Sequence, residues 1–145
     1  MAEAAEGQST LPAHGEFCWA EIASTDLEKC KSFYSNVFGW EFSKSKATGD
    51  EMEYLEFSSA GEAYPDGALY QMTPEMFGGE IPPAHIALYV SADDVDAAAE
   101  KAKGLGGSLV FGPMDIPNVG RFAVVADPTG AAISMITLAE GGHAQ

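Results

Sequence analysis

The stretch TDLEKCKSFYSNVFGW (25–40) decides the fold, because it holds a whole helix together with the signals that start and stop it. Thr25 and Glu28 have the spacing of a capping box, and Gly39 stands where helices commonly end. Apolar side chains recur between these points at helical intervals: Leu27, Cys30, Phe33, Tyr34, Val37 and Phe38. We therefore expect an amphipathic helix that packs one face against a sheet.

Extended segments lie on both sides of this helix. Residues 16–23 (EFCWAEIA) alternate as a strand does, with Trp19 and Glu21 on one face and Ile22 on the other. After the helix, residues 40–43, 52–58 and 68–72 predict three further strands. The first half of the chain thus predicts the order strand, helix and three strands.

The second half repeats this order 68 residues later. The matching pairs keep apolar positions and the glycine stop: Asp26 with Asp94, Leu27 with Val95, Gly39 with Gly107, and Tyr54 with Phe122. The repeat predicts a strand at 85–91, a helix at 94–105 and strands at 108–111, 121–126 and 131–137. We interpret the repeat as an internal duplication.

These elements predict an α+β fold with two βαβββ modules in tandem, at about 16–72 and 84–138, joined by a linker at 73–83. Neither module can close its own sheet. We expect the two to form a curved eight-stranded mixed sheet with a concave ligand pocket. The ordered domain would span 15–138, with flexible tails at 1–14 and 139–145.

The charge of the chain excludes several classes of partner. Its 145 residues include 7 basic and 22 acidic side chains, for a net charge of −15. Such a surface repels phosphate backbones and anionic lipids, so we expect neither nucleic acid nor a membrane as partner, whereas a cationic ligand would be attracted. No apolar run long enough for a membrane span and no signal-peptide pattern occur, which predicts a cytoplasmic location.

Two segments carry a resemblance to a known family. The helix pattern at 25–40 and the sequence GRFAVVADPTGA (120–131), with its D-P-x-G-A turn, resemble the glyoxalase, bleomycin-resistance and extradiol-dioxygenase superfamily, also called vicinal oxygen chelate proteins. The resemblance implies paired βαβββ modules, frequently in a homodimer, with a pocket in the concave sheet. It also implies that enzymatic members hold one divalent metal with four His or Glu side chains, one from the first and one from the fourth strand of each module.

This sequence departs from that metal-binding pattern. The positions that would supply the first-strand ligands are Trp19 and Ala87, and a last-strand ligand falls on Ser134. The remaining position falls among residues 70–72, where no His or Glu occurs. Serine is a poor ligand for a divalent metal. We therefore expect no complete metal site and no cofactor, with a divalent metal (zinc, nickel, iron or manganese) as the alternative.

His85 and Glu21 are the only plausible metal ligands and the candidate catalytic residues. His85 stands two residues before the expected ligand position, so a bulge would be needed to bring its imidazole to the metal. Its alternatives are a hydrogen bond to the backbone or a place in the pocket lining. Glu21 on a partly apolar face would act as a general base or pair with a cationic ligand, unless it is solvated at the sheet rim.

Five further side chains are candidates for ligand binding: Trp19, Tyr70, Tyr89, Arg121 and Ser134. The aromatic ones would stack on a ligand or belong to the core. Arg121 would hold an anionic group or form an ion pair with one of the many acidic residues.

Three functions remain open from these residues. The favoured one is a protein of the glyoxalase and bleomycin-resistance type that binds a small, cationic or aromatic molecule without a complete metal site. The alternative is a metal-dependent lyase, isomerase or dioxygenase that uses His85 and Glu21. An interaction module with no ligand is the third.

Overall fold

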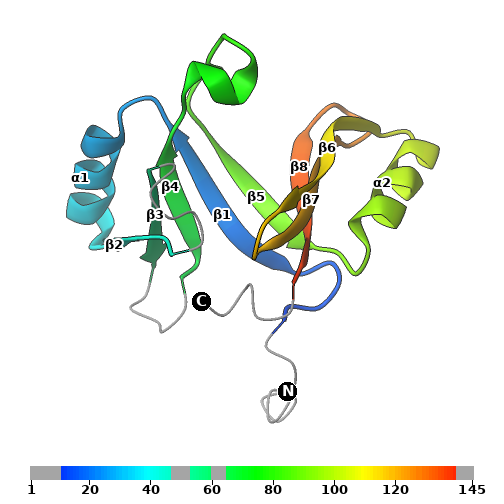
Figure 1. Cartoon of the computed structure of the whole chain (residues 1–145), viewed down its shortest axis with the longest axis horizontal. Coiled ribbons are helices and arrows are strands. Elements are labelled where there is room, and N and C mark those ends of the chain that lie inside the picture. The colour runs from blue at the N-terminus through cyan, green and yellow to red at the C-terminus, as the bar shows by residue number, and fades with distance from the viewer. Residues whose placement is uncertain (1–10, 47–52, 60–64, 140–145) are drawn as a thin grey trace. The chain divides into compact units, whose positions relative to one another are not determined.

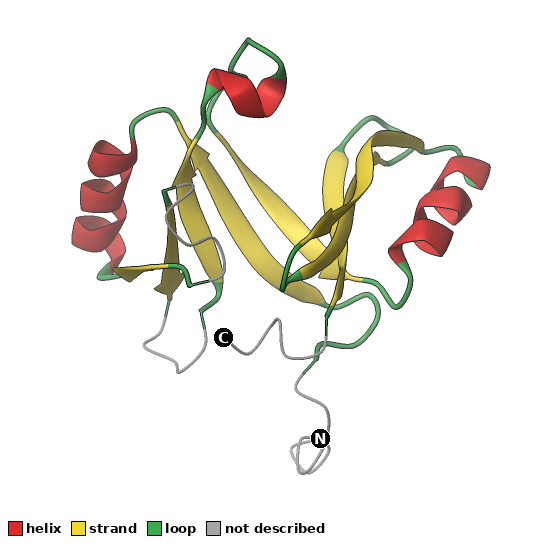
Figure 2. Cartoon of the chain, viewed as in Figure 1, coloured by secondary structure: helices red, strands yellow, loops and turns green. Residues whose placement is uncertain are grey.

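A computed structural model describes residues 11–46, 53–59 and 65–139 of the chain. The elements follow in the order β1 (Phe17–Ser24), α1 (Leu27–Phe38), β2 (Glu41–Lys44), β3 (Tyr54–Ser58), β4 (Gly67–Gln71), the short 3-10 helix η2 (Pro74–Phe77), β5 (His85–Ser91), α2 (Val95–Gly104), β6 (Ser108–Ile116), β7 (Gly120–Ala126) and β8 (Ala132–Leu138) (Figures 1 and 2). The predicted α+β class and its two βαβββ modules are confirmed. Across the described ranges, neither α-helix is long and apolar enough to cross a membrane.

The chain divides into two compact units, residues 19–88 and residues 1–18 with 89–145. Module 1 (β1 to β4) has the strand order β2-β3-β4-β1, in which only the β1–β4 pair is parallel. Module 2 (β5 to β8) has the order β5-β8-β7-β6, in which only the β5–β8 pair is parallel. The same mixed pairing in both modules is what an internal duplication predicts.

Equivalent side chains start the two helices. Asp26 caps α1 by accepting a hydrogen bond from the backbone N–H of Lys29, and Asp94 caps α2 in the same way through the N–H groups of residues 96 and 97. The expected cap at Thr25 is therefore wrong by one residue. Gly39 ends α1 as expected, with a φ of 78° in the left-handed region that glycine adopts without strain.

A fourth-strand side chain also anchors each helix to its sheet. The side-chain oxygen of Gln71 accepts from the backbone N–H of Leu27 at 2.9 Å, and the hydroxyl of Thr137 accepts from the N–H of Val95 at 2.8 Å. Both bonds satisfy helix N–H groups that have no partner within the helix. They fix the start of each helix against the end of the parallel strand.

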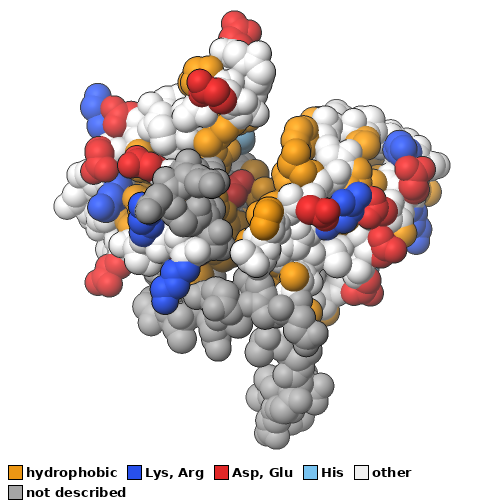
Figure 3. Space-filling view, viewed as in Figure 1, with side chains coloured by type: hydrophobic (Ala, Val, Ile, Leu, Met, Phe, Trp, Pro, Cys, Tyr) orange, Lys and Arg blue, Asp and Glu red, His pale blue; other side chains and the backbone are white. Residues whose placement is uncertain are grey.

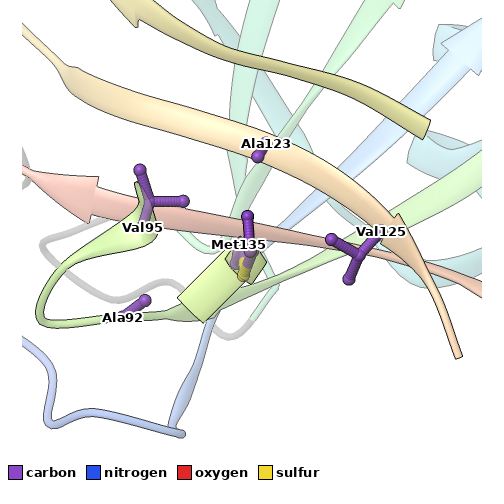
Figure 4. Packing of buried hydrophobic residues seen from close by; sticks show 6 residues of the cluster. Ala92, Val95, Ala123, Val125 and Met135 are labelled. Carbon is purple, nitrogen blue, oxygen red and sulfur yellow. The ribbon is translucent and has the colours of Figure 1, made fainter. Parts of the chain in front are cut away.

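Each helix covers one face of its own sheet. In module 1, Leu27 of α1 packs with Ile22, Phe57 and Leu69, and Trp40 stacks on Phe57 with ring centroids 4.5 Å apart. In module 2, Figure 4 shows the corresponding cluster: Ala92, Val95, Ala99, Ala123, Val125 and Met135. Burial of these apolar side chains holds helix and sheet together in each module.

One strand boundary differs clearly from the prediction. β6 runs to Ile116 instead of ending at residue 111, because register shifts around Gly112 and Pro113 let the strand continue past these residues. β3 begins at Tyr54, and the predicted start at Met52 lies outside the described residues, as do most of the predicted tails. The linker at 73–83 contains η2.

The thiols play no part in a disulfide. Cys18 and Cys30 are both free and half-buried. Burial, together with the charge of Glu16, raises the pKa of Cys18 to about 11. This thiol therefore stays protonated at neutral pH and is a poor nucleophile.

Gly67 allows β1 and β4 to approach each other closely, and replacing it tests this contact. A Cβ atom at this position would overlap the carbonyl oxygen of Ala20 and lie 3.0 Å from the ring of Phe57. We expect Gly67→Ala to lower the free energy of unfolding by about 2 kcal/mol, as overpacking does in other cores, measured by urea denaturation. Gly104→Ala is the control, because a Cβ there meets open space, and we expect it to stabilise by about 0.5 kcal/mol. Equal stability of the two variants would contradict the close approach.

Candidate functional site

The strands of module 1 present a second face, away from α1. Side chains alternate along a strand, so Ile22 of β1 joins the core under α1 while Trp19 and Glu21 point to the other side. The register places Ala68 opposite Glu21 and Tyr70 opposite Tyr54. Tyr54, Ala68 and Tyr70 therefore share this second face, which α1 does not cover.

A chain of hydrogen bonds joins three side chains on this face. The indole Nε1–H of Trp19 donates to the hydroxyl of Tyr54 at 3.0 Å. That hydroxyl donates to Oε2 of Glu21 at 2.6 Å. A distance this short is typical of an O–H group that donates to an ionised carboxylate. All three side chains are partly buried.

Tyr70 completes the group. Its ring lies 6.1 Å from that of Tyr54, centroid to centroid. Burial, together with the negative charge of Glu21, raises the pKa of Tyr70 to about 12. We call Trp19, Glu21, Tyr54 and Tyr70 the polar aromatic face. The three aromatic rings can stack on a flat ligand, and the carboxylate can accept a hydrogen bond from it.

The surroundings of this face are acidic. Glu56 lies on the same side of β3 as Tyr54, across Ala68 from Glu21, and accepts a hydrogen bond from the hydroxyl of Ser45 at 2.8 Å. The strands β1, β3 and β4 contain no Lys or Arg. Elsewhere on the surface, acidic and basic side chains lie among each other (Figure 3). The polar aromatic face therefore has carboxylates but no cation on its own strands.

His85 contacts the backbone just before its own strand. It opens β5, is exposed, and its Nδ1 lies 2.7 Å from the carbonyl oxygen of Pro83. This is the backbone hydrogen bond that the sequence left as an alternative to catalysis. The carboxylate of Glu21 accepts a hydrogen bond from Tyr54, so these hydrogen bonds of the two candidate residues go to different partners.

Tyr89 and Ser134 lie together in module 2. They are Cα partners in the β5–β8 register and both are buried. The ring of Tyr89 lies 6.3 Å from that of Phe122. By register, Tyr89 corresponds to Glu21 of module 1 and Phe122 to Tyr54. The equivalent positions of module 2 thus lack the carboxylate.

Arg121 lies on the side of β7 that faces α2. Its guanidinium contacts Asp96 through Nε at 2.8 Å and Nη2 at 3.1 Å, and Asp115 through Nη1 at 3.0 Å. Hydrogen bonds to these carboxylates raise the pKa of Arg121, and the bond to Arg121 lowers the pKa of Asp96. The structure shows the ion pair that was the alternative to ligand binding, on the opposite face from Tyr89 and Ser134.

The residues present do not fit a four-ligand metal site. Trp19 and Ala87 offer neither imidazole nor carboxylate, and Ser134 offers only a hydroxyl. Within residues 11–46, 53–59 and 65–139, no group of three His, Cys, Asp or Glu side chains is arranged to hold a metal ion.

Tyr54 is the residue that sequence reasoning missed. The repeat aligns Tyr54 with Phe122, but the sequence alone predicts no partner for the hydroxyl of Tyr54. The signal was its position three residues before Phe57: a core residue at 57 places 54 on the opposite face of the strand, with Glu21.

The titration of Tyr70 tests the geometry of this face. We expect its phenol to ionise with a pKa of about 12, and Glu21→Gln to lower that pKa but leave it above the ordinary 10.0, because burial is the larger cause. Since the folded state keeps this proton to higher pH than the unfolded state, its contribution to stability is complete below pH 10.0 and is lost as the pH rises to about 12.

The measurement is tyrosinate absorbance against pH, with Tyr70→Phe subtracted to isolate this residue. A wild-type pKa near 10, or no change in Glu21→Gln, would contradict the placement of Tyr70 beside Glu21.

Curated relatives are similar to this sequence over most of its length. The chain is 36% identical over 131 residues to a Mycobacterium tuberculosis protein whose provisional name is glyoxylase CFP32, covering 90% of this chain and 47% of the relative. It is 32% identical over 130 residues to the anthracycline biosynthesis protein DnrV of Streptomyces peucetius, covering 85% of this chain and 47% of the relative. The chain spans about half the length of these relatives.

Solved structures share the fold. The Mn(II)-bound glyoxalase from Novosphingobium aromaticivorans matches with a TM-score of 0.57 and 18% identity, over 88% of this chain and 40% of that one. Methylmalonyl-CoA epimerase in complex with methylmalonyl-CoA and NH4+ matches with a TM-score of 0.55 and 18% identity, over 88% and 96%. Members with this fold therefore include a metal-bound enzyme and an enzyme with a small-molecule ligand.

A family model settles the membership. The model described as the Glyoxalase/Bleomycin resistance protein/Dioxygenase superfamily matches residues 17–135. This range covers both modules from β1 into β8. The chain belongs to the glyoxalase, bleomycin-resistance and dioxygenase superfamily.

Proposed function

We propose that this protein binds a small aromatic molecule at the polar aromatic face of module 1, without a complete superfamily metal site. The observation that carries the proposal is the hydrogen-bonded chain from Trp19 through Tyr54 to Glu21. It fixes the orientation of an indole, a phenol and a carboxylate on a sheet face that α1 leaves uncovered. Ligand sites typically combine such apolar surfaces with a few oriented polar groups.

Each side chain has a role in this proposal. The rings of Trp19 and Tyr70 stack on the ligand, and Glu21 accepts a hydrogen bond from it. Tyr54 holds the carboxylate of Glu21 in place.

The comparisons support a small-molecule ligand. The family name includes bleomycin-resistance proteins, one relative is named for anthracycline biosynthesis, and one structure of this fold contains a CoA ester. Positions 19, 87 and 134, where the family resemblance places metal ligands, hold Trp, Ala and Ser in this chain. The family resemblance also supports a homodimer as the acting form.

Binding of aromatic probes tests the proposal. We expect saturable binding, by isothermal titration calorimetry, of at least one of four probes: daunorubicin, 2-naphthamidine, 2-naphthamide and 2-naphthoate. Trp19→Leu should weaken that binding about fivefold, since loss of a stacking ring costs on the order of 1 kcal/mol. Tyr70→Leu should act in the same direction.

The matched control is Phe33→Leu, which removes an aromatic ring that is 56% exposed on α1. It should leave the affinity unchanged. The proposal fails if none of the four probes binds, or if Phe33→Leu weakens binding as much as Trp19→Leu does. Conversion of a probe to a product would instead favour the enzymatic alternative.

A further inference from the structure

We propose that the polar aromatic face selects an organic cation, a protonated amine or amidine attached to an aromatic ring, and that Tyr54 is the positioning residue for this selectivity. The inference rests on the proposed function, since it names the charge class of the ligand for the same site.

The direction of the hydrogen bonds is the first argument. An indole N–H can only donate, so the oxygen of Tyr54 accepts from Trp19 at 3.0 Å. The single phenolic hydrogen of Tyr54 then goes to Glu21, whose Oε2 lies 2.6 Å away. A carboxylate has about four acceptor sites and no donor when it is ionised. The group that meets a ligand here is therefore an oriented acceptor with a full negative charge, and its complement is a cationic donor.

The second argument is the charge of the neighbouring side chains. Glu56 is the second carboxylate on this face, and the strands β1, β3 and β4 hold no Lys or Arg. An anionic ligand would meet two carboxylates without a cation on these strands to offset them. A cation would also lie close to the rings of Tyr54 and Tyr70, whose π faces attract positive charge.

Module 2 provides an internal comparison. Its register places Tyr89, Phe122 and Ile136 where module 1 has Glu21, Tyr54 and Tyr70. Phe122 differs from Tyr54 only by the missing hydroxyl, and the acid is absent. The two modules thus share a backbone plan, and the selectivity for charge comes from the side chains of module 1.

The experiment uses three probes with one ring system and head groups of similar size: 2-naphthamidine (cation), 2-naphthamide (neutral) and 2-naphthoate (anion). Their dissociation constants are measured by calorimetry at neutral pH on the full chain. We expect the amidine to bind at least tenfold more tightly than the amide, and the naphthoate to bind most weakly.

Variants assign the selectivity to residues. Glu21→Gln should reduce the tenfold difference between amidine and amide to less than threefold. Tyr54→Phe should weaken amidine binding at least threefold while changing amide binding less than twofold, because the carboxylate loses its fixed orientation but the ring remains. A merely structural role of Tyr54 would weaken both probes equally. If Glu21→Gln does not fold, Tyr54→Phe carries the same test.

Glu100→Gln is the matched control. It removes the same charge from the exposed surface of α2, where Glu100 pairs with Lys103, and should leave the preference unchanged. Equal affinities for the three probes in the wild type would overturn this inference and leave the proposed function standing. Absence of binding by all four probes, daunorubicin included, would overturn both. A preference that Glu100→Gln reduces as much as Glu21→Gln does would assign it to net charge and overturn the role of this site.

Discussion

One helix can cover only one face of a sheet, and this constraint organises each module. Alternation along β1, β3 and β4 sends Ile22, Phe57 and Leu69 under α1. The same alternation sends Trp19, Glu21, Tyr54 and Tyr70 to the other side. A carboxylate that is partly buried among aromatic rings needs hydrogen-bond donors, and the hydroxyl of Tyr54 supplies one at 2.6 Å. The packing that forms the core thus also determines which residues can form a site.

The two modules share the same strand pairing and helix anchors, but their sheet faces away from the helices carry different side chains. Asp26 and Asp94 cap the helices, and Gln71 and Thr137 anchor them, so the structural bonds are retained in both modules. The faces away from the helices differ: module 1 has the carboxylate and its donor chain, whereas module 2 has Tyr89 packed against Phe122. Both modules therefore keep the bonds that each needs to fold, while the faces away from the helices differ.

Much of the fold was predictable, because helix periodicity, strand alternation and the repeat all act locally. The strands and both helices lie close to their expected positions, and the family resemblance was confirmed. The strand predicted at 108–111 continues as β6 to Ile116 through a register shift, which depends on pairing with β7 rather than on local sequence.

The site was predictable only in part. Alternation placed Trp19 and Glu21 on one face, and the structure shows them there. The link through Tyr54 depends on which strands pair and in which register, and neither follows from the order of elements. The same is true of the ion pairs that hold Arg121 on the α2 side, whereas the bond between His85 and Pro83 joins residues two apart in the sequence and was among the alternatives left open for His85.

The indole N–H resonances of the two tryptophans test the central claim most directly. Trp19 donates to Tyr54, whereas Trp40 stacks on Phe57 in the core of module 1. In ¹H–¹⁵N spectra, we predict that Tyr54→Phe shifts the Nε1–H signal of Trp19 and leaves that of Trp40 in place, and that 2-naphthamidine does the same in the wild type. A Trp19 signal that neither change moves, or equal shifts of both indoles, would contradict the account.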